Sequence, residues 1–156
     1  IMLVLMADQD RARWDHAAIT EATMLLDRAV LLRRPGPFQA QAAIACLHGL
    51  APTFADTDWS QIASLYRTLE RYTPTPVVRV NRVVAVAAAE GAATALALLD
   101  ELDQQQVERW HLYWSTRAEM LARLGRAAES RDAFDRALQC SPNDSDRAFL
   151  QSRRHR

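Results

Sequence analysis

The 156-residue sequence contains no lysine, only four glycines and only two cysteines. All 19 basic residues are arginine, and with the abundant alanine this indicates a GC-rich coding sequence, so the arginine excess is not evidence of phosphate binding. The formal net charge is zero, which argues against a nucleic-acid-binding domain, because such domains usually carry a basic face. Cys46 and Cys140 lack metal-ligand spacing and are expected to be reduced thiols in the cytoplasm.

Motifs for catalysis, metals and cofactors are also missing. A glycine-rich phosphate-binding loop is hard to form with only four glycines, and no GxSxG, Walker or GxGxxG motif occurs. The four histidines are scattered without metal spacing. The acidic stretch ADQD, followed by Asp15, is explained by helix capping and by pairing with Arg11 and Arg13. The sequence therefore predicts no enzyme, no metal site and no cofactor.

No apolar run reaches the length of a membrane span, so no contact with a membrane is expected. The opening IMLVLM is too short for a signal-peptide core and has neither a basic leader nor a cleavage site. These absences predict a cytoplasmic location. Because the chain begins with Ile1 and not with methionine, we expect it to be a fragment of a longer protein.

Helical periodicity and capping signals divide the chain into helices with short connections. Asp15 is expected to cap the first helix, Pro37 to begin the second, and Asp56 or Thr57 to cap the third. Gly125 is expected to end a long helix in a left-handed conformation. The expected helices cover residues 15–32, 38–50, 59–72, 77–89, 92–103, 107–125, 127–139 and 143–154.

The stretch VVRVNRVVAV, residues 77–86, combines strand-forming valines with three polar residues. On a strand, Arg79 and Asn81 would share one face while Arg82 would occupy the other, which leaves no clean alternation. On a helix, Arg79 and Arg82 are neighbours on one side and Asn81 lies on the opposite, small-residue side. The stretch is therefore predicted to be helical.

Residues spaced by 34 or by twice 34 indicate an internal repeat of paired helices, which is typical of tetratricopeptide repeats (TPR). Residues 111–144 carry the pattern best, with small residues where the two helices approach and large residues beside them. In this unit Ser130 replaces the usual small alanine. The spaced pairs are Gly91 with Gly125, Tyr66 with Phe134, and Pro74 with Pro142, and the pattern positions are Trp114, Ala118, Leu121, Gly125, Phe134, Ala137, Leu138 and Pro142.

The repeat phase predicts an all-α fold of about seven to eight helices, stacked as hairpins in a TPR-like right-handed superhelix. A single domain is expected over residues 1–156. It would comprise N-terminal helices over 14–50, repeat units of approximately 43–76, 77–110 and 111–144, and a terminal helix over 144–153.

The first helix of each repeat lines the concave groove of such a superhelix, and Asn81 falls on a groove-facing position. One interpretation is that Asn81 hydrogen-bonds an extended peptide backbone or a carboxylate, with Arg79 or Arg82 supplying charge. The other is that its amide ties the helix to a neighbouring loop. Further candidates for partner binding in the groove are His48, Ser115 and Glu119.

Several stretches together resemble the C-terminal, TPR-like extension of extracytoplasmic-function (ECF) bacterial RNA polymerase sigma factors. They occur in order and span nearly the whole chain. They are DQDRARWD (8–15), LLRRPGPFQAQAAIACLH (31–48), DTDWSQIASLYRTL (56–69), PTPVVRVNRVVAV (74–86), RAEMLARLGR (117–126) and NDSDRAFLQSR (143–153).

The resemblance implies a regulatory, protein-interacting domain of a protein that acts in transcription initiation. Its partners would be the sigma domains of the same chain, RNA polymerase, or another protein or peptide. Helices that read promoter DNA would lie upstream of Ile1, so DNA would be bound only through them. The alternative is a free-standing TPR adaptor that binds a peptide in its groove. A more remote alternative is a small-molecule sensor that uses the groove as a pocket.

Overall fold

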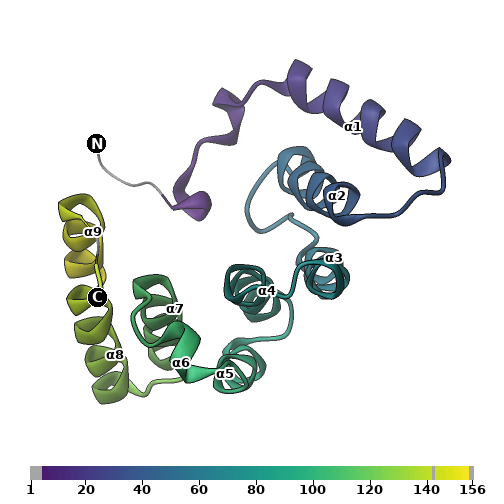
Figure 1. Cartoon of the computed structure of the whole chain (residues 1–156). Coiled ribbons are helices and arrows are strands. Elements are labelled where there is room, and N and C mark those ends of the chain that lie inside the picture. The colour runs from purple at the N-terminus through teal and green to yellow at the C-terminus, as the bar shows by residue number, and fades with distance from the viewer. Residues whose placement is uncertain (1–4, 142, 155–156) are drawn as a thin grey trace. The chain divides into compact units, whose positions relative to one another are not determined.

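The computed structural model describes residues 5–141 and 143–154, and within them it contains helices and no strand (Figure 1). This confirms the predicted all-α class. The elements of the described part of the chain are the 3₁₀ helices η1 (Met6–Asp8) and η2 (Arg11–Arg13), followed by nine α-helices: α1 (His16–Leu31), α2 (Pro37–Leu50), α3 (Trp59–Tyr72), α4 (Pro76–Ala89), α5 (Ala92–Asp100), α6 (Gln104–Val107), α7 (His111–Arg123), α8 (Ala127–Gln139) and α9 (Asp144–Arg154).

The described residues contain one helix more than the expected seven to eight, and the predicted long helix over 107–125 begins later than expected. A short helix, α6, ends at Val107, and α7 begins at His111. Asp103 caps α6 by accepting a hydrogen bond from the Gln105 amide at 3.0 Å. Trp110 has extended backbone angles (φ −108°, ψ 110°), so the chain changes direction between the two helices.

Most predicted helix ends are confirmed, and one cap is corrected. The Asp15 carboxylate accepts from the Ala18 amide at 2.9 Å, and Pro37 begins α2. The cap of α3 is Asp58, whose carboxylate accepts from the Gln61 amide at 2.9 Å, and not Asp56 or Thr57. Both of those residues bond Thr53 instead: the Asp56 carboxylate accepts from its hydroxyl, and the Thr57 hydroxyl donates to its carbonyl.

The valine-rich stretch lies in α4 and is helical, as predicted. Its residue composition is typical of strands, yet α4 buries side chains over much of its circumference, including Val80, Val83 and Val86. Branched apolar side chains are favoured there by burial, which outweighs their small loss of helix propensity.

The contacts divide the chain into two compact units, with the boundary inside α4 after Arg82. In the N-terminal unit α1 packs on α2 and α2 on α3, around a core that includes Ile44, Ile62 and Leu69. In the C-terminal unit α5 packs on α7, α7 on α8 and α8 on α9. Helical repeats contact only their neighbours, so such a division is expected of them. The single domain and the right-handed superhelix stay predictions.

The α7–α8 hairpin has the packing that its repeat pattern predicts. Ala118, Leu121, Phe134 and Ala137 are buried where the helices meet. Gly125 has φ +74°, the left-handed conformation expected at the end of α7. Pro142, which was expected to end α8, lies outside the described residues.

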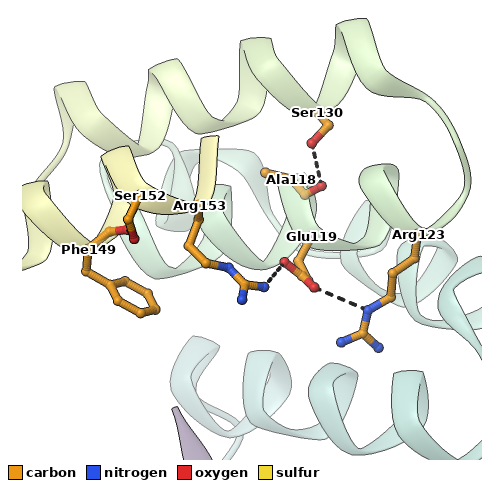
Figure 2. A network of polar contacts seen from close by, with 7 residues as sticks. All are labelled: Ala118, Glu119, Arg123, Ser130, Phe149, Ser152 and Arg153. Atoms are coloured by element: carbon orange, nitrogen blue, oxygen red, sulfur yellow. Dashed lines mark hydrogen bonds and ion pairs between the residues drawn. The ribbon is translucent and has the colours of Figure 1, made fainter. Parts of the chain in front are cut away.

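Ser130, the departure from the pattern, is buried and donates a hydrogen bond to the Ala118 carbonyl at 2.8 Å (Figure 2). The hydroxyl is thereby satisfied inside the hairpin, so the substitution is compatible with a buried position.

Candidate functional site

A pocket of about 820 Å³ opens in the N-terminal unit, between α1 on one side and α2, α3 and α4 on the other. Its volume falls within the range of small-molecule and peptide-anchor sites. Most of its lining is apolar, and the polar groups are few. The lining residues are Met6, Trp14, Asp15, Ala18, Ile19, Gln41, Ile44, Ala45, His48, Gly49, Tyr66, Leu69, Val77, Val78 and Asn81.

A glycine sets how closely α1 approaches α2 at this pocket. Ile19 of α1 packs over Gly49 of α2, and a Cβ placed on Gly49 would lie 3.1 Å from Ile19 Cγ2. That distance is shorter than an ordinary carbon–carbon contact, so a side chain at Gly49 would push α1 outwards. Because Gly49 has no side chain, α1 can lie close to α2, and this sets the position of α1 as one wall of the pocket.

Arg11 fixes the segment before α1 to the end of α2. Its side chain is buried, and Nη1 donates to the carbonyls of His48 and Ala51, each at 2.9 Å. The guanidinium also lies 5.0 Å from the ring centre of Trp14. A cation at the carboxyl end of a helix opposes the partial negative charge of its free carbonyls. Arg11 thus caps α2 and holds Trp14 at the pocket.

His48 presents a neutral ring to the pocket. Burial lowers the pKa of His48 below its ordinary 6.5, and the nearby positive charge of Arg11 lowers it further. The ring packs edge-on against Trp59, with 5.2 Å between ring centres. Its Nδ1 is buried and has no hydrogen-bond partner among the described residues. A neutral imidazole can offer a donor or an acceptor to an occupant.

Asn81 lines the pocket from α4, but Arg79 and Arg82 do not. Both arginines bind Glu70 of α3, with Arg79 Nε 3.0 Å from Oε1 and Arg82 Nη1 2.8 Å from Oε2. Asn81 is exposed, and its side chain makes no hydrogen bond within the part of the chain that the structure describes. The structure therefore places Asn81 with His48 and separates it from the two arginines.

The pocket lining is almost uncharged. Burial raises the pKa of Tyr66, so its phenol stays protonated at neutral pH. Asp15 is the one charged residue among the described lining residues, and its carboxylate accepts from the Ala18 amide as the cap of α1. No lysine or arginine of residues 5–141 or 143–154 lines the pocket, so these residues supply no cation to hold a carboxylate or phosphate there. Its chemistry suits a neutral, mainly apolar occupant that carries an amide-like hydrogen-bonding group.

Ser115 and Glu119, the other predicted groove residues, lie on α7 in the C-terminal unit and already have hydrogen-bond partners, as Figure 2 shows for Glu119. The Ser115 hydroxyl donates to the Leu112 carbonyl at 3.1 Å. The Glu119 carboxylate accepts from Arg123 at 3.4 Å and from Arg153 of α9. Both residues thus have structural bonds within their own unit.

Sequence reasoning missed Arg11, Gln41 and Tyr66 as parts of the site. Arg11 was expected to pair with a neighbouring carboxylate, and this is wrong: it bonds carbonyls of α2, 37 and 40 residues away. Capping by the acidic residues is confirmed, since Asp10 and Asp15 both accept backbone hydrogen bonds. No local pattern marks a long-range cap, so only the tertiary structure could reveal Arg11.

Two classes of site find no support in the described ranges. Residues 5–141 and 143–154 contain no cluster of three or more histidine, cysteine or acidic side chains that could hold a metal ion. The helices of the same ranges include none long and apolar enough to cross a membrane.

The chain is 46% identical over 148 residues to an uncharacterized protein of Rhizobium meliloti (strain 1021), and the match covers 95% of this chain and 35% of that protein. The chain thus spans about a third of the length of this relative. No family model matches, and no solved structure gives a significant match.

Proposed function

We propose that this chain is the regulatory, protein-interacting domain of an ECF-type sigma factor, and that the pocket of its N-terminal unit docks a segment of a partner protein. The observation that carries the interaction role is the apolar pocket with Asn81 at its lining, whose amide has no hydrogen-bond partner among the described residues. Such a site takes an apolar side chain and bonds the main chain beside it. The partner is the set of sigma domains of the same polypeptide, or RNA polymerase.

The link to sigma factors is supported by the ordered sequence stretches that resemble the family's C-terminal extension. The relative from Rhizobium meliloti, of which the match covers 35%, is long enough to hold further domains. On this proposal promoter DNA is read by helices outside this chain, and the protein works in the cytoplasm with the polymerase. The net charge of zero agrees with a domain that does not itself bind DNA.

Transcription tests the proposal directly. Promoter-specific transcription by core polymerase would be measured in vitro with the longer protein, with and without residues 1–156. We expect the deletion to change transcript yield while core-polymerase binding by the sigma domains persists. Equal transcription in both cases would contradict the regulatory role. A reading frame that starts at residue 1, without sigma helices before it, would favour the free-standing adaptor.

The docking role of Asn81 has its own test in the longer protein. Asn81→Ala should leave the helical circular dichroism and melting temperature almost unchanged, since the exposed amide has no partner among the described residues. It should nevertheless reproduce part of the effect of the deletion on transcription. Gln61→Ala on α3 is the matched control, because Gln61 is exposed and outside the pocket lining. A loss of more than about 2 kcal/mol in stability would instead assign Asn81 a structural role.

A further inference from the structure

Helix α1 buries none of its 16 residues, although ten of them are apolar. Its principal contact is with α2, and Figure 1 shows no other α-helix of the N-terminal unit along its remaining sides. Leu25 is 55% exposed and Leu32 at its end is 71% exposed. Large exposed apolar side chains grouped on one helix mark a surface that another element covers.

Five apolar residues along α1 form a seam beside the face that meets α2, and the strongly exposed Met24, Val30 and Leu31 lie outside it. The seam consists of Ala18, Ala22, Leu25, Ala29 and Leu32, at alternating spacings of four and three residues. This is the spacing of a coiled-coil seam, and over 14 residues it is about 21 Å long. Ile19, which packs over Gly49 of α2, points about 100° away from the centre of the seam. A second helix can therefore lie on the seam beside the face that meets α2, with Ala18 at the edge of the pocket.

Two opposite charges border the seam on the side away from α2. Glu21 and Arg28 are seven residues apart and lie on the same edge, as the flanking charges of a coiled coil do. Neither forms an ion pair within residues 5–141 or 143–154. Such flanking charges decide which partner helix fits and in which orientation.

The seam is complementary to itself when two copies run antiparallel about Leu25. Glu21 lies four residues before Leu25 and Arg28 three residues after it, so each Glu21 comes within about 1.5 Å along the axis of an Arg28 in the other copy. Ala18 and Leu32 lie seven residues to either side, so each small residue meets a large one. In a parallel arrangement this edge would instead face the opposite edge of the other copy, which carries Ile19 and Leu26, so neither charge would meet an opposite charge. The charge pairs and the small-to-large pairs therefore favour a second copy of this chain, with its α1 running antiparallel, as the occupant of the seam.

We propose that the exposed seam of α1 is a homodimer interface, in which α1 of a second copy of this chain packs antiparallel across Leu25. The contact is isologous, so each pairing occurs twice around a two-fold axis. Alanine at three of the five seam positions allows the two helix backbones to approach closely. The dimer is argued from α1 alone and does not rest on the docking role of Asn81, but Ala18 belongs both to the seam and to the pocket lining.

Sedimentation velocity of the chain over about 1 to 300 μM, at low salt, measures the association. We expect a concentration-dependent dimer, since a seam of this length buries less than a standard permanent interface. Leu25→Glu should make the chain monomeric over the whole range. Met24→Glu is the matched control: Met24 is 62% exposed on the same helix but outside the seam, and its variant should still dimerise. Circular dichroism would confirm that both variants remain folded.

A charge exchange tests the antiparallel orientation. Glu21→Arg alone places two arginines together twice and should weaken the dimer about tenfold. The double variant E21R/R28E restores opposite charges and should restore the dimer. A wild-type chain that stays monomeric throughout, or a dimer that survives Leu25→Glu, would overturn the proposal. A dimer that is equally strong in Glu21→Arg would overturn the antiparallel arrangement on which it rests.

Discussion

Replacing Arg11 with methionine should loosen the N-terminal segment from α2 and raise the pKa of His48. Arg11 is buried, and its Nη1 donates to two carbonyls at the end of α2. Methionine keeps most of the aliphatic length and the contact with Trp14 but removes the charge and both hydrogen bonds.

The size of the effect follows from two opposing contributions. Each bond from a charged donor contributes about 1.5–3 kcal/mol, and the interaction with the helix end adds up to about 2 kcal/mol. Against this, the variant no longer has to bury a charge, which costs several kcal/mol when no carboxylate pairs with it. We expect a net loss of about 2 kcal/mol in the free energy of unfolding. In urea this lowers the midpoint by about 1 M.

Urea unfolding, followed by circular dichroism at 222 nm, measures the first effect, and an NMR titration of the His48 ring measures the second. The pKa of His48 should rise towards 6.5 without reaching it, because burial is the larger cause of its depression and remains. Arg13→Met is the control, since Arg13 is exposed in the same short helix η2. Unchanged stability together with an unchanged His48 titration would refute the role assigned to Arg11.

Three further perturbations test other parts of the structure. Folding lowers the pKa of His48, so the unfolded chain binds more protons than the folded chain below pH 6.5. The free energy of unfolding should therefore fall as pH decreases from 6.5 towards the folded-state pKa. In thermal melts from pH 8 to 5, the melting temperature should decrease less in His48→Gln than in the control His16→Gln. Ser130→Ala removes the bond to the Ala118 carbonyl and should cost about 1 kcal/mol in denaturant unfolding, and a gain in stability would contradict this account. Gly125→Ala places a side chain at φ +74° and should cost about 1 kcal/mol, whereas an unchanged melting temperature would show that this turn relaxes freely.

Local signals were sufficient to predict most helices. Asp15 and Pro37 mark helix starts through backbone chemistry within one turn, so the structure confirms them. The cap of α3 was misplaced by one or two residues because three neighbouring side chains were each able to cap. The break at 108–110 was missed because the apolar pattern continues through Trp110, and only packing decides where α7 begins.

Among the candidate site residues, the sequence placed Asn81 and His48 in a groove, and the structure brings them to one pocket. The helix period correctly separated Asn81 from Arg79 and Arg82. It carried no information about Glu70, which lies on another helix and binds both arginines. The sequence therefore led us to expect a charged site with Arg79 or Arg82 beside Asn81, whereas the structure shows a nearly uncharged pocket.

The sequence by itself determined the helical class, the ends of most helices and the repeat spacing, because these depend on hydrogen bonds and periodicity within a few residues. Only the tertiary structure decided which charges are free and which are paired, as the contacts of Arg11 with the end of α2 and of Glu119 with Arg153 show. Those contacts join residues 34 or more positions apart. Their partners are selected by how the helices pack, which no short stretch of sequence specifies.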